Sequence, residues 1–443
     1  MVMKYKTQKH KNPKLSSSNI ALVWLAIWFP TFPLFLGTAG QMMSLGVTSF
    51  IFIIYMLFSP RHGLRFFGYS FFILFYVYFF LTAWFSAVQD VVRFGPNIVY
   101  VFEVLKYLLY ALIFFWFCSL KVTSVQEIQS VFKSYFLLFI LLGIWGVLEV
   151  MGPSEFKDLA YFLYKREYKE IIRNKAVGPF GITYYYSFIM LLPLSVAYAK
   201  FLFGDAPLKS FFVTLFFALS VLLSQSRSSF IGLVIIFIVY SFFPLSYKLG
   251  KGGKVVFVYL SFVSLIAFFV YLFWEDLILG FSYTYSGISR MMGGSISEAI
   301  DSVGSISVRL DQFLWAVKDS GVLIFTGGGL GKDLVPLESV YALYIYRHGI
   351  FGLIFFALFL LKVVQCFYRC SKISLKLGYI GLASTFMGGA VFFLISPIPL
   401  ISSASQDSAK IAFLFYATCG FVFACHRHLK GALYKLQKSA TIY

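Results

Sequence analysis

The amino-acid sequence predicts an all-α polytopic membrane protein from its composition, the length of its apolar runs and the placement of its basic residues. Hydrophobic residues make up 60% of the 443-residue chain, aromatic residues 21% and charged residues 12%, and the mean hydropathy is +0.83. Soluble globular proteins are only about 45–50% apolar. The composition therefore excludes a soluble globular protein.

Apolar runs predict about twelve transmembrane helices, because a helix needs about 20 apolar residues to cross the hydrocarbon core of a bilayer. The first run is predicted to be a retained span, because the basic segment before it is too long for a signal peptide and lacks a small-residue cleavage site. The seventh and eighth runs are short for a bilayer. In chain order the predicted spans are residues 19–37, 44–59, 66–87, 98–118, 134–151, 184–203, 208–223, 230–245, 255–274, 340–361, 377–395 and 411–425.

The basic residues are distributed unevenly between the two sides of these spans. If the N-terminus lies in the cytoplasm, about 22 of the 37 Lys and Arg residues lie inside, against the two acidic residues Glu127 and Asp205. This bias predicts that both termini are cytoplasmic. The net charge of +19 follows from it, and predicts contact with membrane lipid of the anionic inner leaflet and not with nucleic acid.

Two predicted outward loops, residues 152–183 and 275–339, are long, whereas the inward loops are short. Loops of more than about 15 residues are usually functional or disordered. In the first loop, residues 154–175 predict an amphipathic helix in the membrane interface, either as part of a site or as a plain anchor. The chain as a whole is predicted to be a single integral membrane domain over residues 1–443.

The second long loop predicts a short helix. Its apolar residues recur at i, i+3, i+4 and i+7 from Leu310, with Arg309 and Gln312 on the other side. Gly321 is placed to end this helix, because glycine readily adopts the left-handed conformation found after helix C-termini.

Metal and serine chemistry are not predicted. The five cysteines fall within spans or at their cytoplasmic ends, so no outer disulfide is expected. Cys366 and Cys370 have no second Cys or His pair near them, and the sequence contains no HExxH, no GxSxG and no outward carboxylate pair with metal-ligand spacing. We therefore predict no metal site and no cofactor.

The glycine-rich run at residues 326–333 has the sequence TGGGLGKD. A phosphate-binding P-loop needs a glycine five residues before the Gly-Lys pair and a Ser or Thr after the lysine. Thr326 and Asp333 occupy those positions. The run therefore predicts a tight outward turn, whose backbone N–H groups could still meet a phosphate.

Charged residues within or beside apolar runs are candidate site residues. An arginine near hydrocarbon costs on the order of 3 kcal/mol, so it should face protein, water or an anionic ligand. Arg227 is the sole charge of a polar hairpin, SQSRSS, and Arg347 and His348 lie about two to three turns inside the tenth span. A snorkelling arginine at position 227 and a structural interhelix role for His348 are the alternatives.

Polar residues from separate elements converge on the predicted outer surface. Arg309, the turn at residues 327–331 and Glu338, at the start of the tenth span, lie on one side of the membrane. Guanidinium groups bind phosphate oxygens through paired hydrogen bonds. The pattern predicts a site for a charged, lipid-linked substrate. Glu338, or else Asp333, is the predicted general base.

Four segments, in their order, resemble the O-antigen polymerase and O-antigen ligase superfamily. They are RNKAVGPFGITYYYSFIMLLPLSVAYA (173–199), LLSQSRSSFIGLVI (222–235), SVRLDQFLWA followed by FTGGGLGKD, and ESVYALYIYRHGIFGLIFF (338–356). The resemblance implies a GT-C-like fold and a glycosyltransferase of lipopolysaccharide or polysaccharide biosynthesis. It implies undecaprenyl-pyrophosphate-linked oligosaccharides as substrates, and an active site on the periplasmic side of the bacterial inner (cytoplasmic) membrane. A chain-length-regulating membrane protein is a further candidate partner.

The resemblance also assigns residues. Arg173 matches the arginine before a Gly-Pro-like turn in the first large loop, Arg309 the arginine before the glycine-rich turn, and Arg227 the Ser-Arg of the short hairpin. Ligases of this superfamily carry a histidine near the position of Glu338, and the second long loop here contains none. This departure favours a polymerase. The predicted catalytic residues are Arg173, Arg309 and Glu338, and the predicted substrate-binding residues are Arg166, Arg227, Arg290, Asp333, Tyr341, Arg347 and His348.

We therefore expect a metal-independent glycosyltransferase that polymerises lipid-linked oligosaccharide repeat units by inverting glycosyl transfer. A ligase that transfers the glycan to lipid A-core is one alternative. A flippase or transporter of lipid-linked sugars is another. A transporter is expected to carry a polar path through the membrane midplane and inverted repeats, whereas the charge of this sequence is concentrated on the outer side.

Overall fold

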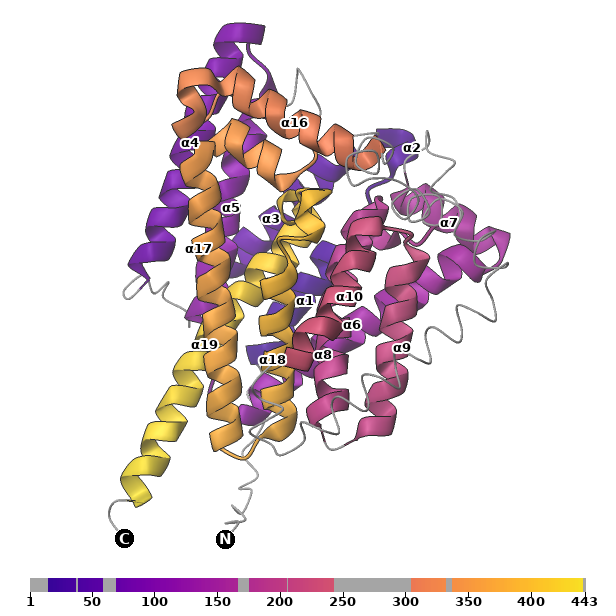
Figure 1. The fold of residues 1–443 in the computed structure, drawn as a ribbon, viewed down its shortest axis with the longest axis vertical. Coiled ribbons are helices and arrows are strands. Elements are labelled where there is room, and N and C mark those ends of the chain that lie inside the picture. Colours follow the sequence, from indigo (N-terminus) through magenta and orange to yellow (C-terminus); the bar gives the residue numbers. More distant parts are fainter. Residues whose placement is uncertain are drawn as a thin grey trace.

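The computed structural model describes residues 15–36, 39–58, 69–165, 175–204, 206–242, 304–331 and 337–440, and every regular element in these ranges is a helix (Figure 1). The helices of the first half are α1 Leu15–Trp28, α2 Pro33–Leu36, α3 Ala39–Phe58, α4 Ser70–Phe94, α5 Ile98–Ser119, α6 Val125–Met151, α7 Ser154–Tyr164, η2 Gly178–Phe180, α8 Thr183–Phe203, α9 Pro207–Leu223 and α10 Arg227–Phe242. Those of the second half are α16 Gly304–Ser320, η3 Gly321–Phe325, α17 Val340–Lys376, α18 Ile380–Ile395, η4 Pro399–Ile401, η5 Ser405–Asp407 and α19 Ala409–Ala440.

Seven helices in the described ranges are long and apolar enough to cross a membrane, as an integral membrane protein requires. They are Ser70–Phe94, Ile98–Ser119, Val125–Met151, Thr183–Phe203, Val340–Lys376, Ile380–Ile401 and Ala409–Ser439. Four shorter apolar helices, at Ser18–Trp28, Met43–Phe58, Pro207–Leu223 and Arg227–Tyr240, coincide with four further predicted spans. The predicted span at residues 255–274 lies outside the described residues. The helical membrane character is thus confirmed, and the count of twelve and the GT-C-like topology stay predictions.

Two predicted helix ends differ from the observed ones. The tenth span was expected to end at residue 361, where the apolar run meets Lys362, but α17 continues to Lys376. The extension is amphipathic: Cys366, Phe367 and Cys370 are buried. One apolar face is therefore enough to prolong the helix beyond the continuous apolar run. The first-loop helix was expected over residues 154–175, and α7 ends at Tyr164, with residues 166–174 outside the described ranges.

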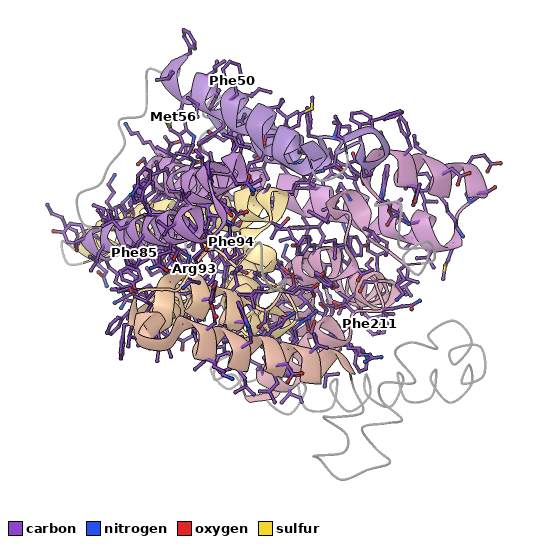
Figure 2. The ribbon with its side chains drawn as sticks, turned by 90° about the horizontal axis from the view of Figure 1, so that it is seen from above. Phe50, Met56, Phe85, Arg93, Phe94 and Phe211 are labelled. Carbon is purple, nitrogen blue, oxygen red and sulfur yellow. The ribbon has the colours of Figure 1, made fainter. Side chains whose placement is uncertain are left out.

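The centre of the bundle is formed by α8, α18 and the N-terminal half of α19, whose most apolar stretches are largely buried. Gly388 of α18 lies directly against the backbone of Val196 in α8, where a Cβ atom would overlap it. Small residues allow such close approach of membrane helices. Large apolar side chains instead point outward at the rim, as Phe50 of α3 and Phe85 of α4 do in the view from above (Figure 2). The bundle thus presents an apolar surface to lipid.

α16 lies across one end of this bundle, opposite the C-terminal end of α19 (Figure 1). We call the end of the bundle that α16 covers the α16 end. Below it, α17 is broken at Gly349, which has φ 68° and ψ −176°. Carbonyl groups before the break accept hydrogen bonds from outside the helix: Tyr346 O from Gly328 N–H at 2.7 Å, Arg347 O from Ser86 Oγ at 2.8 Å, and His348 O from the Tyr78 hydroxyl at 2.7 Å. The glycine-rich turn and α4 therefore hold the break in place.

Replacing Gly349 by alanine is expected to destabilise the protein. A side chain would force an L-residue into a left-handed conformation that costs about 1–3 kcal/mol, and its Cβ would overlap the carbonyl group of Phe325. The midpoint of thermal denaturation in detergent should fall. Gly381→Ala is the control, because nothing lies within 4 Å of a Cβ at that helical position; equal midpoints for the two variants would contradict the prediction.

Candidate functional site

The predicted helix of the second long loop is present as α16, and it ends where expected: Gly321, with φ 49°, follows Ser320. Its orientation is informative. Gln312, Ala316 and Ser320 face the bundle and are buried, whereas Leu310 and Leu314 are exposed. Of the predicted apolar stripe, Leu310 and Leu314 are thus available for contact with the membrane interface, whereas Phe313 and Val317 pack against the core of the protein.

Arg309 and Glu338, two of the three predicted catalytic residues, form an ion pair at the α16 end. Arg309 Nε also donates to Ser402 O at 3.2 Å. The backbone on either side of Glu338 is fixed, because its N–H donates to Gln312 Oε1 at 3.2 Å and its carbonyl accepts from Ala404 N–H at 2.6 Å. The side chain of Glu338 is 37% exposed and that of Arg309 18%. A substrate can thus reach both charges.

Two further cations lie near each other beside α10. Ala176 N–H donates to Leu223 O at 3.0 Å, which places Lys175 next to the hairpin that carries Arg227. Burial lowers the pKa of Lys175, and the positive charge of Arg227 lowers it further. Two neighbouring cations are a favourable environment for an anion. α10, which begins at Arg227, packs against η4, and η4 is followed directly by Ser402, whose carbonyl accepts from Arg309.

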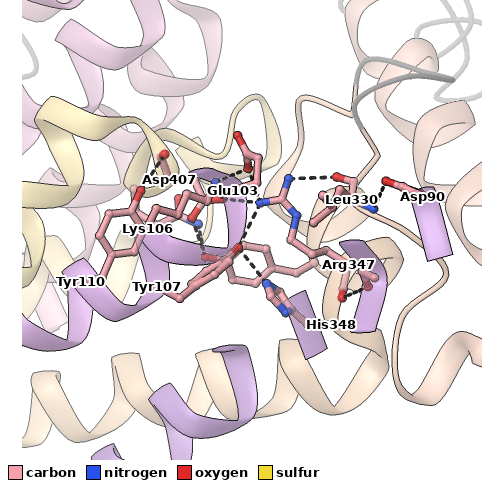
Figure 3. Close-up of polar contacts among 12 residues, drawn as sticks. Asp90, Glu103, Lys106, Tyr107, Tyr110, Leu330, Arg347, His348 and Asp407 are labelled. Carbon is pink, nitrogen blue, oxygen red and sulfur yellow. Dashed lines mark hydrogen bonds and ion pairs between the residues drawn. The ribbon is translucent and has the colours of Figure 1, made fainter. Parts of the chain in front are cut away.

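A second group of charges lies inside the bundle (Figure 3). Arg347 is fully buried, and its Nη1 atom lies 2.9 Å from Glu103 Oε2 and 3.4 Å from Asp407 Oδ2. Lys106 Nζ lies 2.6 Å from Glu103 Oε2 and 3.0 Å from Asp407 Oδ2. We call these four residues the charge network. Its two cations and two carboxylates neutralise one another, as buried charges require.

Neutral groups surround the charge network. Arg347 donates to the Tyr107 hydroxyl at 3.1 Å and to Leu330 O at 2.9 Å. The ring nitrogens of His348 lie 2.9 Å from the Tyr107 hydroxyl and 2.7 Å from Thr82 Oγ1. Arg347 and His348, which we predicted to bind substrate, therefore contact protein groups in this structure. For His348 these contacts favour the structural interhelix role.

The described part of the glycine-rich run, residues 326–331, lies outside any regular helix as a turn requires, and three of its N–H groups have protein partners. Gly328 and Gly329 both donate to Tyr346 O, at 2.7 and 3.2 Å, and Leu330 N–H donates to Asp90 Oδ2 at 2.8 Å. A phosphate at the α16 end would therefore be bound by side chains and not by these three amides.

The other predicted site residues fall into two sets. Tyr341 lies one turn from Glu338, and its hydroxyl donates to Pro397 O at 2.9 Å. The remaining four lie outside the described residues: Arg166, Arg173, Arg290 and Asp333.

Sequence analysis missed Lys175 and three members of the charge network. Glu103 and Lys106 carried a signal, since they stand three residues apart in an apolar span where single charges are costly. Asp407 carried a weaker one, because it lies between two spans and resembles an ordinary loop residue. For Lys175 the sequence carried no signal beyond its nearness to Arg173.

The described residues contain no group of three or more His, Cys, Asp or Glu side chains that could hold a metal ion. All five cysteines are buried, and none forms a disulfide bond. Comparison with models of known protein families gives no match, and a search of curated proteins finds none detectably similar to this chain. The interpretation of the site therefore depends on its own geometry.

Proposed function

We propose that the chain polymerises undecaprenyl-pyrophosphate-linked oligosaccharide repeat units by inverting glycosyl transfer. The observation that carries the proposal is the contact between Arg309 and Glu338 at the α16 end, where both remain partly exposed. A cation that binds phosphate and a carboxylate that accepts a proton are the two groups that this reaction needs side by side.

In the proposed reaction, a hydroxyl oxygen of one lipid-linked repeat unit attacks the anomeric carbon of the sugar chain on another lipid. The bond between that carbon and the pyrophosphate oxygen breaks, and its electron pair leaves with the lipid pyrophosphate. The hydroxyl proton passes to the carboxylate of Glu338. Arg309, with Arg173 from the first loop, stabilises the negative charge that develops on the leaving group.

In the proposed reaction, the ion pair between Arg309 and Glu338 sets the order in which the donor and the acceptor hydroxyl are bound. While Arg309 and Glu338 are bound to each other, the guanidinium occupies a carboxylate oxygen that would otherwise accept the proton. A pyrophosphate group carries more charge than a carboxylate and can accept the guanidinium fork. Binding of the donor would thus release Glu338 for the acceptor hydroxyl. Charge stabilisation by arginines also lets the reaction proceed without a metal ion.

Lys175 and Arg227 fit the same reaction as a second anion-binding pair. The positive charge of Arg227 lowers the pKa of Lys175, and an anion bound between them would reverse that effect. Two lipid-linked substrates bring two pyrophosphate groups to the enzyme. The second pair is a candidate site for the pyrophosphate of the acceptor.

The proposed setting is the bacterial inner membrane, with both termini cytoplasmic and the α16 end in the periplasm. The basic bias of the predicted inward loops supports this orientation. The exposed Leu310 and Leu314 of α16 would then lie at the outer interface, near the head groups of lipid-linked substrates. A membrane protein that regulates chain length is the proposed partner.

A flippase or transporter of lipid-linked sugars is the second candidate, and the charge network favours it. Charged residues inside a membrane bundle commonly mark ion or substrate pathways. In this structure, however, all four charges contact one another. A transporter that uses them would have to separate these pairs in each cycle.

The test is to incubate purified protein with lipid-linked repeat units, without nucleotide sugar or metal ions. A polymerase yields a ladder of products and releases undecaprenyl pyrophosphate, and a chelator has no effect. A ligase leaves the repeat units unextended until lipid A-core is added, and a transporter forms no glycosidic bond. If folded protein makes no ladder from its cognate repeat unit, the polymerase proposal is wrong.

A further inference from the structure

The segment between α18 and α19 joins the candidate site to the charge network. Two of its residues touch the site, since Ser402 O accepts from Arg309 and Ala404 N–H donates to Glu338 O at 2.6 Å. Asp407, two residues before α19, belongs to the charge network. Only a few residues separate the two sets of contacts, so we call residues 402–407 the linking segment.

Asp407 is the fixed end of this segment. Its carboxylate contacts Lys106 at 3.0 Å and Arg347 at 3.4 Å, and its backbone carbonyl accepts from the Tyr110 hydroxyl at 3.0 Å. The neighbouring Gln406 donates to the Tyr344 hydroxyl at 3.0 Å. These partners come from α5 and α17, two of the long helices of the bundle.

The contacts form a closed circuit. Glu338 immediately precedes α17, Arg347 lies within α17, Arg347 contacts Asp407, and the linking segment returns to Glu338 through Ala404. A displacement of Asp407 therefore cannot be absorbed by the loop alone, because the loop is bound at both ends.

We propose that Asp407 is a positioning residue: by anchoring the linking segment to Lys106 and Arg347, it holds Glu338 and Arg309 in contact. The claim that Asp407 holds these two residues in place concerns the structure alone. The consequence for catalysis rests on the proposed function, in which Glu338 receives the proton of the acceptor hydroxyl.

The structural claim is tested by cross-linking. A Glu338→Cys and Ala404→Cys pair replaces two residues joined by a backbone hydrogen bond, and mild oxidation should link them quickly. Adding Asp407→Asn is expected to slow the cross-link about 2- to 30-fold, because residues that act at a distance commonly alter such couplings by 0.5–2 kcal/mol. Asp407→Glu should restore part of the rate, since it keeps the charge.

A matched control pair is Thr31→Cys with Leu163→Cys. These residues are also joined by a backbone hydrogen bond, of 3.0 Å, but Thr31 follows α1 and Leu163 lies within α7, and the described hydrogen bonds of Thr31 go to Leu163 and not to the linking segment. Their cross-linking rate should not change when Asp407→Asn is added. An unchanged rate for the 338–404 pair in the Asp407→Asn background would overturn the proposal, and slowing of both pairs equally would show general loosening instead.

The catalytic consequence is measured separately in chain extension. Asp407→Asn, with the native Glu338 and Ala404, should lower kcat while the KM for repeat units stays near its normal value, because Asp407 does not touch substrate. If Asp407→Asn does not fold, Lys106→Gln removes one of its two anchors and should act in the same direction. A slower cross-link without any effect on extension would retain the positioning role and count against Glu338 as the base.

Discussion

Replacing Arg309 by alanine is expected to lower the rate of chain extension by about 10²–10³-fold, the usual effect of removing one preorganised group that stabilises developing negative charge. The variant should still insert and fold, because its guanidinium is partly exposed and its partners Glu338 and Ser402 lie at the surface of the α16 end. The measurement is the initial rate of ladder formation by purified protein. Arg173→Ala is expected to act likewise from the first loop.

Two variants separate charge from geometry at this position. Arg309→Lys keeps the charge but cannot bind Ser402 O and a phosphate with one planar fork, so it should recover only part of the rate. Glu338→Gln keeps Arg309 and removes the base, and it should also slow the ladder strongly. Near-normal polymer from Arg309→Ala would mean that this arginine is only an interfacial anchor.

Replacing Arg347 by methionine is expected to lower the free energy of unfolding by about 3–5 kcal/mol, the usual cost of removing one partner from a buried ion pair. Glu103 and Asp407 would lose a cation that lies 2.9 and 3.4 Å away, and Leu330 O would lose its donor. Methionine fills most of the volume, so the loss reports on charge and hydrogen bonding. The measurement is denaturant unfolding of the protein in detergent micelles.

The matched variant is the double replacement Arg347→Met with Glu103→Gln. Removing one charge of each sign leaves Lys106 and Asp407 as a neutral pair, so the double variant should be more stable than Arg347→Met alone. If the single and double variants unfold at the same denaturant concentration, uncompensated charge is not the cause of the instability.

Local features of the structure were predictable from the sequence. The period of apolar residues and Gly321 defined α16, and glycine composition defined the turn at residues 327–331. The predicted membrane topology placed Arg309 and Glu338 on the same side of the membrane. Their direct contact was not predictable, because it depends on how α16 is rotated about its axis. In the structure Phe313 and Val317 pack against the core while Leu310 and Leu314 are exposed and Gln312 is buried, a rotation that the apolar period alone does not define.

Contacts between distant segments were not predictable. Arg347 and Asp407 are 60 residues apart, and Arg347 and Tyr107 are 240 apart. A single sequence shows which residues stand beside each charge along the chain, but not which distant residue it contacts in the fold. The hydrogen bonds of the Gly328 and Gly329 N–H groups were not predictable for the same reason. Their acceptor, Tyr346 O, can accept them because α17 breaks at Gly349.

The break in α17 also constrains how the molecule assembles. In the broken form of α17 the carbonyl groups before Gly349 have their partners outside the helix, and an unpaired peptide group in hydrocarbon is costly. One set of partners, on α4, has already been synthesised, and the other, on the glycine-rich turn, emerges just before α17. We therefore expect α17 to enter as a straight helix and to bend only after it docks on α4. Completion of the α16 end would then be a late step in biogenesis.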